Sequence, residues 1–385
     1  MRARWMAGAA AMAVMAAAGC ADGGQAIAHP TLTSGIQATP RTTPATAVSS
    51  SPAREPAVTG AAPVASDPGT LTLAFGGDVH FEDYLRPLAS DPHGLDRLRS
   101  TLGAADLSMV NLETAITTRG TKIGKEFHFR APATALDTLA SAGVDAVSMA
   151  NNHGVDYGPV GLRDTLAAKK ASPIPIVGIG ANEDEAFASA TLKAKGVSVA
   201  VLSASQIYEM TLLNWSADSD SPGIASSAPV TRLVAAVKKA KRTHDVVVVF
   251  LHWGLDYQKC PDGQSTSTAT ALEAAGADVV VGGHSHRVNG AGWLGDAYVG
   301  YGLGNFVWWR SSEPDSRTGV LTLSVDVRRA TAAKRPPGPV VRKAVWTPML
   351  IGRDGIPEVA SGADAPRLLG LWQQAGRCTG LATSP

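Results

Sequence analysis

The stretch that decides the fold is Val279-Val280-Val281-Gly282-Gly283-His284-Ser285-His286, an apolar run that ends in two glycines and two histidines. Three β-branched residues followed by Gly-Gly are typical of a buried strand that ends in a turn. Residues two apart in an extended backbone point to the same side. The segment therefore predicts a buried strand whose tip presents a pair of imidazoles.

Four other segments also place a polar group just past an apolar run: Asp78-Val79-His80, Asn111-Leu112-Glu113, Asn151-Asn152-His153 and Leu251-His252-Trp253. The run before Glu113 is the shortest of them. In an open α/β sheet the tips of successive strands meet at one edge, where ligands bind. We therefore expect these groups to converge, and as a set they are typical of a two-metal centre.

Strand and helix patterns alternate along the chain, which favours an α/β class with partly parallel sheets. Strands are predicted over 71–75, 106–110, 144–149, 197–203, 246–251 and 279–281, and helices over 133–142, 159–170, 229–242 and 267–276. The segments 298–301, 320–327 and 340–346 read as strands without long helices between them. They suggest a second sheet with antiparallel pairing, so two packed sheets flanked by helices are expected.

The chain has 385 residues, and 34 Lys and Arg against 33 Asp and Glu give a net charge of +1. Nothing in this charge balance indicates a concentrated basic face, so nucleic acid is not an expected partner. Residues 1–19 resemble a signal peptide, with two arginines before a short apolar run. The run ends Ala17-Ala18-Gly19-Cys20, which resembles a lipobox and predicts export and a lipid anchor on Cys20 at the outer face of the membrane. Ordinary secretion, with Cys20 as a bystander, is the alternative.

Three further segments are expected after the signal peptide. Residues 20–68 are mostly Ala, Thr, Pro, Ser and Gly and read as a flexible tether. Residues 69–350 are predicted to form the main domain, and residues 351–385 a C-terminal extension packed on it. With Cys20 lipidated, Cys260 and Cys378 either form a disulfide that fastens this extension or remain free thiols.

Seven side chains in the strand-tip segments are of types that bind divalent cations: Asp78, His80, Glu113, Asn152, His252, His284 and His286. Taken singly, two such residues two apart are also typical of a surface turn, and an Asn after a strand is typical of a helix cap. A lone His after an apolar run can be a hydrogen-bonded core residue. Five of the nine histidines follow predicted strands, however, and this joint pattern favours a metal centre.

The motifs, in order, resemble those of the calcineurin-like metallophosphatases and, among these, the CapA family linked to poly-γ-glutamate capsule synthesis. The resemblance covers about residues 70 to 310. It rests on Gly77-Asp78-x-His80, Asn111-Leu112-Glu113-Thr114, Phe127-His128-Phe129-Arg130-Ala131-Pro132, Ala150-Asn151-Asn152-His153, Asp156-Tyr157-Gly158, His252-Trp253-Gly254, Gly283-His284-x-His286 and Gly302-Leu303-Gly304-Asn305-Phe306. It implies a four-layer αββα sandwich and one or two divalent ions, with Mn, Fe or Zn equally suited to mixed N/O ligands.

The resemblance also implies roles for the site residues. One metal is held by Asp78, His80 and His286, the other by Asn152, His252 and His284, and Glu113 bridges them. This chain departs from the phosphatases in having Glu113 where they have Asp, and from many CapA relatives in having His80.

Two further residues are catalytic candidates. The resemblance implies that His153 acts as the general acid, and Arg130 is a candidate for gripping a carboxylate or phosphate. A structural salt bridge is the alternative for Arg130. The aromatic group after Gly304, namely Phe306, Trp308 and Trp309, can either wall a substrate cleft or pack in the core.

Three functions remain open at this point. The first is a surface-anchored CapA-like protein that acts in synthesis, export or anchoring of an anionic capsule polymer, with a metal-dependent hydrolytic centre and membrane-bound synthase subunits as partners. The second is an envelope metallophosphoesterase that acts on phosphate esters. The third is a non-catalytic scaffold that binds polymer. Fold alone does not choose among them.

Overall fold

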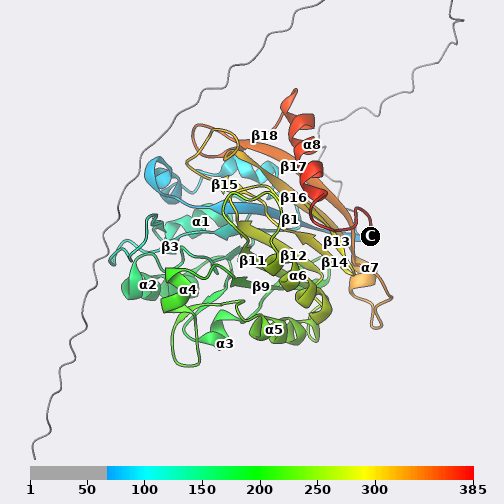
Figure 1. The fold of residues 1–385 in the computed structure, drawn as a ribbon, viewed down its shortest axis with the longest axis horizontal. Coiled ribbons are helices and arrows are strands. Elements are labelled where there is room, and N and C mark those ends of the chain that lie inside the picture. The colour runs from blue at the N-terminus through cyan, green and yellow to red at the C-terminus, as the bar shows by residue number, and fades with distance from the viewer. Residues whose placement is uncertain (1–66) are drawn as a thin grey trace, which may run out of the picture. The chain divides into compact units, whose positions relative to one another are not determined.

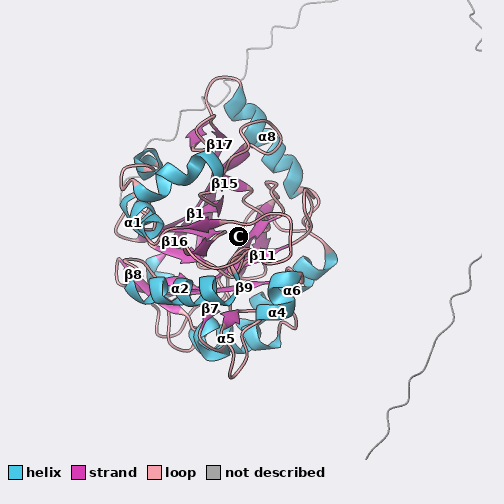
Figure 2. Ribbon diagram, turned by 90° about the vertical axis from the view of Figure 1, so that its left-hand side faces the viewer, coloured by secondary structure: helices cyan, strands magenta, loops and turns pink. Residues whose placement is uncertain are grey.

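The computed structural model of the protein describes residues 67–385. The expected signal peptide and almost all of the expected tether lie outside these residues. Two β-sheets pack face to face, and helices cover the outer face of each sheet (Figure 1). Figure 2 shows the same layers from the side. The predicted four-layer αββα sandwich is confirmed.

The first sheet has eight strands and is parallel in one half and antiparallel in the other. Its order is β18 (Pro357–Val359), β17 (Val341–Ile351), β16 (Arg317–Asp326), β1 (Thr70–Val79), β2 (Leu107–Leu112), β5 (Ala146–Ser148) and β6 (Ile176–Val177), with β15 (Asn305–Val307) also paired to β1.

The second sheet has six strands and a parallel centre. Its order is β13 (Ala291–Leu294), β14 (Ala297–Gly300), β12 (Val279–His284), β11 (Val246–Trp253), β9 (Val197–Ser205) and β8 (Ala190–Ala194). Two short ribbons complete the strands: β3 (Ala115–Ile116) with β4 (Arg130–Ala131), and β7 (Ile179–Gly180) with β10 (Gly223–Ile224).

The helices agree closely with the four predicted ranges and add several more. They are α1 (Thr134–Ser141), α2 (Gly158–Ala171), α3 (Glu183–Ala186), α4 (Met210–Trp215), α5 (Thr231–Lys241), α6 (Gly263–Ala275), α7 (Val327–Ala330) and α8 (Asp364–Gly376), with two 3₁₀ helices, η1 (Asp83–Ser90) and η2 (Asp96–Ser100). Among the residues that the structure describes, no helix combines the length and the apolar character needed to cross a membrane.

Three hydrophobic cores separate the four layers, and β11 shows how one strand serves two of them. Val248 and Phe250 point into the core between the sheets, whereas Val247 and Val249 point into the core beneath α5 and α6. This alternation is the period of two of a pleated strand. The third core lies between the first sheet and the helices α1 and α2, where Leu136 is one of its members.

The late strands do not form a second sheet of their own, so that prediction is wrong. Strand β14 joins the second sheet, parallel to β12. Strands β16 and β17 instead extend the first sheet, because β16 pairs antiparallel with β1 along the whole register from Thr70↔Asp326 to Phe75↔Leu321. The sequence pattern identified these strands but not the pairing of β16 with β1, which is far away along the chain.

The C-terminal segment is fastened to the rest of the chain at several points. Cys260 and Cys378 form a disulfide, which is the paired alternative of the two considered. Trp372 of α8 stacks on Trp346 of β17, and the backbones of Trp293 and Ala382 exchange two hydrogen bonds. The segment beyond residue 351 therefore lies against both sheets.

Candidate metal centre

The carboxylates of the site come from the first sheet and most of its imidazoles from the second. Asp78 lies near the end of β1, and Glu113 follows β2 directly. His252 lies within β11 and His284 is the last residue of β12, where the register pairs His252 with Gly283. The side chains of Asp78, Glu113 and His252 are fully buried. The site therefore lies at the seam where the carboxyl ends of both sheets meet.

The sheets approach each other so closely at this seam that only glycine fits at position 283. A Cβ on Gly283 would lie 2.1 Å from Asp78 Oδ1. The next residue, His284, donates its backbone N–H to Asp78 Oδ2 at 2.9 Å. His284 and His286 have φ angles of 91° and 52°, conformations that L-residues seldom adopt outside functional sites. The backbone is thus bent to bring both histidines onto the carboxylates.

Glu113 is a fully buried carboxylate whose two oxygens have no hydrogen-bond partner in the described part of the protein. Its Oε1 lies 3.5 Å from His252 Nε2 and 3.7 Å from His153 Nε2. Burial raises the pKa of Glu113 well above its ordinary value, and the Asp78 carboxylate raises it further. A buried carboxylate without a hydrogen-bond donor destabilises the fold, and a bound cation would compensate its charge.

The donor atoms divide into two groups that share Glu113. Glu113, His252 and His284 form one group and Asp78, Glu113 and His286 the other, with the donor atoms of each within 4.8 Å of one another. Asn152 belongs beside the first group, because its Oδ1 lies 2.8 Å from His252 Nε2. Two ligands on one cation are separated by roughly 3 Å, given metal–ligand distances near 2 Å.

One carboxylate near these groups was missed by the sequence analysis. Asp256, on the exposed loop after β11, lies with Oδ1 3.3 Å from His284 Nε2 and forms a third group with His284 and His286. Nothing in the sequence marked it, since it follows no apolar run.

His80 does not join any of these groups, although it is fully buried beside them. Its Nδ1 accepts the backbone N–H of Glu82 at 3.0 Å, and its ring stacks on Phe129 with centroids 4.4 Å apart. Its Nε2 has no partner among the described residues. A neutral imidazole that accepts at Nδ1 carries its proton on Nε2, so in this arrangement His80 offers a donor rather than a lone pair.

Asn111, also missed as a site residue, connects the two sheets within the site. Its Nδ2 donates to Asp78 Oδ1 at 2.8 Å and lies 3.1 Å from His252 Nδ1. Its Oδ1 accepts from Asn151 Nδ2, which also donates to the Leu112 carbonyl. The Leu112 carbonyl therefore sets the orientation of the Asn151 amide, which sets that of the Asn111 amide. Asn111 in turn sets the orientation of the His252 ring.

His153 is held by a buried ion-pair network on the first-sheet side of the site. Its Nδ1 lies 2.6 Å from Asp156 Oδ2, and Lys125 Nζ lies 2.7 Å from Asp156 Oδ1. Burial raises the pKa of Asp156 to about 6, and Lys125 opposes that shift. The His153 ring also stacks on Phe129 at 3.9 Å. With Nδ1 occupied, Nε2 of His153 is the nitrogen available to a substrate.

A small cavity of about 50 Å³ opens next to His153 and His286. Trp308 and Trp309 both line it, so the two tryptophans wall a cleft while Phe306 lies in the core. Arg130 is not part of this lining.

The structural salt bridge considered for Arg130 is not formed among the described residues, and the role of this residue in gripping a carboxylate or phosphate stays a prediction. Its guanidinium carbon lies 4.7 Å from the ring centroid of Tyr157. No carboxylate among residues 67–385 lies within 4.0 Å of it.

The electrostatics of the imidazoles fit a divalent cation. Burial lowers the pKa of His284 and of His286 to about 4, and lowers that of His252 well below its ordinary value. The three rings are therefore neutral near pH 7, the protonation state in which an imidazole can bind a metal. Neutral imidazoles beside two buried carboxylates and an amide oxygen suit Mn, Fe or Zn.

A model of the family described as "Bacterial capsule synthesis protein PGA_cap" matches residues 72–308. The chain belongs to this family. The PGA_cap match contains every residue of the metal centre described above. The PGA biosynthesis protein CapA of Bacillus subtilis is 28% identical over 245 residues, which cover 62% of this chain and 63% of that protein. The capsule biosynthesis protein CapA of Bacillus anthracis is 31% identical over 199 residues, 50% of this chain and 48% of that protein. The chain thus spans between about half and two thirds of these relatives.

Among solved structures, the NAD nucleotidase NadN of Haemophilus influenzae is similar with a TM-score of 0.42 and 12% identity, covering 82% of this chain and 57% of that one. A hypothetical protein from Thermus thermophilus is similar with a TM-score of 0.42 and 17% identity, covering 72% of this chain and 99% of that one.

Proposed function

We propose that this PGA_cap protein is a metal-dependent hydrolase that acts on an anionic envelope polymer such as poly-γ-glutamate during its synthesis, export or anchoring. The observation that carries the proposal is the fully buried Glu113, whose two oxygens have no protein partner among the described residues while neutral imidazoles surround it. A structural scaffold gains nothing from such a group, since burying an uncompensated carboxylate destabilises the fold.

The chain's own residues divide the work at the site. Asp78, Glu113, Asn152, His252, His284 and His286 would hold one or two divalent cations. Bound there, a divalent cation polarises a carbonyl or phosphoryl oxygen and lowers the pKa of water. Nε2 of His153 would take up the proton that the attacking water loses and pass it to the leaving group, while Asp156 keeps the ring oriented through Nδ1.

The proposed location is outside the cytoplasm, on a lipid anchor at Cys20. The signal-like residues 1–19 and the Ala17-Ala18-Gly19-Cys20 segment support it. The Cys260–Cys378 disulfide supports it independently, because such bonds persist in oxidising compartments. Membrane-bound synthase subunits are proposed as partners, since the chain shows no Walker-type phosphate loop to drive polymerisation itself.

The test is metal content followed by activity. The purified protein is stripped with chelator, reconstituted separately with Mn²⁺, Fe²⁺ and Zn²⁺, and analysed by elemental mass spectrometry. We expect one or two ions per chain in the wild type and a loss of binding in Glu113→Gln and His284→Ala. Release of glutamate oligomers from a γ-linked polymer is then measured, with His153→Ala as the variant that keeps the metal but loses turnover.

The alternatives appear as distinct outcomes of this test. Turnover of phosphate monoesters or diesters without release of glutamate would replace the polymer hydrolase by an envelope phosphoesterase. A protein that binds no ion after reconstitution, yet is folded by circular dichroism, would leave only the non-catalytic scaffold.

A further inference from the structure

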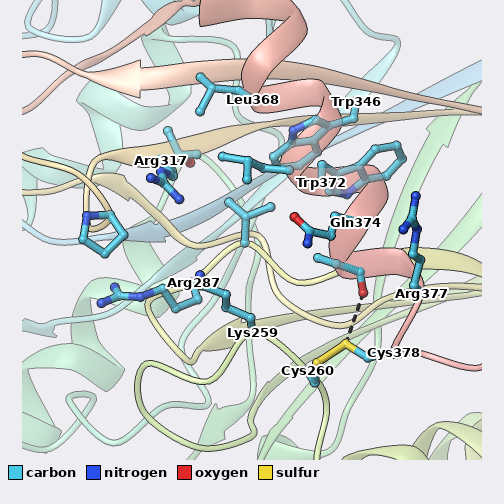
Figure 3. A pocket seen from close by; sticks show the side chains of 15 residues that line it. Lys259, Cys260, Arg287, Arg317, Trp346, Leu368, Trp372, Gln374, Arg377 and Cys378 are labelled. Carbon is cyan, nitrogen blue, oxygen red and sulfur yellow. Dashed lines mark hydrogen bonds between the residues drawn. A yellow bond between two sulfur atoms is a disulfide. The ribbon is translucent and has the colours of Figure 1, made fainter. Parts of the chain in front are cut away.

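A cavity of about 460 Å³ beneath α8 lies outside the metal centre, and the proposed function does not use it. It lies between this helix, strands β16 and β17 and the loop that carries the Cys260–Cys378 disulfide. Figure 3 shows Arg287 and Arg317 on one side of it and Arg377 on the other, with Trp346 and Trp372 between. This volume is within the range of pockets that bind small ligands.

All the charged side chains that line the cavity are cationic. Lys259, Arg287, Arg317 and Arg377 line the cavity, and no Asp or Glu does. Arg287 pairs with Asp315 and Arg317 with Glu313, both of which lie outside the lining.

Lys259 and Arg377 differ from these two paired arginines. No carboxylate of residues 67–385 lies within 4.0 Å of either side chain. Two exposed cations are thus available to an anionic ligand, in a chain whose overall net charge is only +1.

Apart from Thr318 and Gln374, the rest of the lining is mainly apolar and aromatic. The rings of Trp346 and Trp372 stack with centroids 5.8 Å apart and an interplanar angle of 10°. Leu368 and Val288 also line the cavity. A ligand that fits must therefore combine anionic groups with apolar spacers, as a chain of carboxylates separated by methylene groups does; Lys and Arg contact the carboxylates while the tryptophans cover the methylenes.

The cavity shares a wall with the metal centre. Arg287 directly follows His286, donates from Nη1 to Asp315 Oδ1 at 2.6 Å, and lies 4.8 Å over the ring of Tyr257. His286, Asp315 and Tyr257 line the small cavity at the metal centre. One layer of side chains therefore separates the two cavities, so a single extended chain can contact both.

We propose that the cavity beneath α8 is a distal subsite that binds the carboxylates of an anionic chain while another segment of that chain lies at the metal centre. The identity of the chain rests on the proposed function, but the binding itself does not need the metal. Most of the subsite also lies beyond the matched family region of residues 72–308, since β16, β17 and α8 supply Arg317, Trp346 and Trp372, and Arg377 follows α8 directly.

The test measures binding of a fluorescently labelled γ-linked glutamate polymer to the full chain in the presence of EDTA, by anisotropy. The variant is Lys259→Glu with Arg377→Glu, which reverses the two unpaired charges. The matched control is Lys193→Glu with Lys334→Glu, which makes the same change in net charge at two exposed residues outside the cavity. Mass spectrometry under non-reducing conditions verifies that each variant keeps its disulfide.

We expect the dissociation constant to rise at least about tenfold in the Lys259/Arg377 variant, because charge-assisted hydrogen bonds contribute on this scale. The control variant should change the dissociation constant less than about twofold, because single exposed charges contribute little to binding. Trp372→Ala should weaken binding of the polymer more than binding of a free glutamate trimer, because only the longer chain covers the tryptophans.

Three results would overturn the proposal: no polymer binding by the wild type in EDTA, equal weakening by the two charge reversals, or equally tight binding of inorganic polyphosphate. Absence of hydrolysis or of metal, with polymer binding still lost in the Lys259/Arg377 variant, would instead refute only the proposed function of the metal centre.

Discussion

Replacing the bridging candidate by its neutral isostere, Glu113→Gln, should make the metal-free protein more stable. Neither oxygen of Glu113 has a hydrogen-bond partner in the described structure, so the amide loses no existing contact. What it removes is a buried ionisable acid. Burial raises the pKa of that acid above its ordinary value of 4.5, with the nearby Asp78 acting in the same direction.

The magnitude follows from proton linkage. A raised pKa favours the folded state below pH 4.5, and this advantage is lost as the pH rises through the pKa of the folded protein. Each pH unit between the two values costs about 1.4 kcal/mol. At pH 7 the cost of Glu113 therefore reaches at most about 3 kcal/mol, because the unfolded chain titrates near 4.5.

The assay is urea denaturation of wild type and Glu113→Gln, in EDTA and in excess Mn²⁺, from pH 4 to 8. In EDTA the wild type and the variant should have equal free energies of unfolding near pH 4. As the pH rises, the variant should become the more stable of the two. In Mn²⁺ the order should reverse, since a ligand at a thousand times its dissociation constant stabilises the wild type by about 4.1 kcal/mol, more than the cost of the buried acid.

The reasoning fails if the variant is no more stable than wild type at pH 7 in EDTA. It fails equally if Mn²⁺ stabilises both proteins alike, since Glu113 would then be neither an uncompensated acid nor a ligand.

Three other substitutions have defined outcomes. Asp156→Asn removes the carboxylate that orients His153 and should lower kcat of the proposed hydrolase by about tenfold to a hundredfold, with KM little changed; steady-state kinetics measures both. Asp278→Ala removes the nearly buried carboxylate that pairs with both Lys241 and Arg335. This change should lower the free energy of unfolding, measured in urea, by about 3 kcal/mol. Glu313→Gln should cost about 0.5 kcal/mol at pH 7, because this pair is largely exposed. Arg367 lowers the pKa of Glu313 from 4.5 to about 2, so the contribution is present above pH 4.5 and the difference from wild type should close as pH falls toward 2 in an acid titration of stability.

The central strands were predictable because both of their faces are buried. Residues 246–251 and 279–281 are continuous apolar runs, as expected of parallel strands covered on both sides. Strand β8 was missed because its alternation of half-buried and exposed residues resembles a surface loop. The helix α8 was missed for a similar reason, since Leu368 is its one buried residue.

The site was predictable in its residue types but not in its connections. Asp78, Glu113, His252 and the two late histidines follow apolar runs, and the topology brings these runs to one seam. Asn111, Lys125 and Asp256 were missed because their roles depend on neighbours far away in sequence. His80 shows the converse: its spacing from Asp78 fits a ligand pair, whereas its ring is held by Glu82 and Phe129, which the spacing does not reveal.

The seam between the sheets has a consequence for how the molecule matures. Asp78 and Glu113 belong to one sheet and His252 and His284 to the other, so a cation that contacts both sets ties the sheets together. The donor side chains of one sheet meet those of the other only once the two sheets have packed together. A chain whose sheets have not yet packed therefore lacks the complete set of donors. A cation bound at this seam would be retained only by chains whose two sheets are in register, so metal retention would report correct assembly.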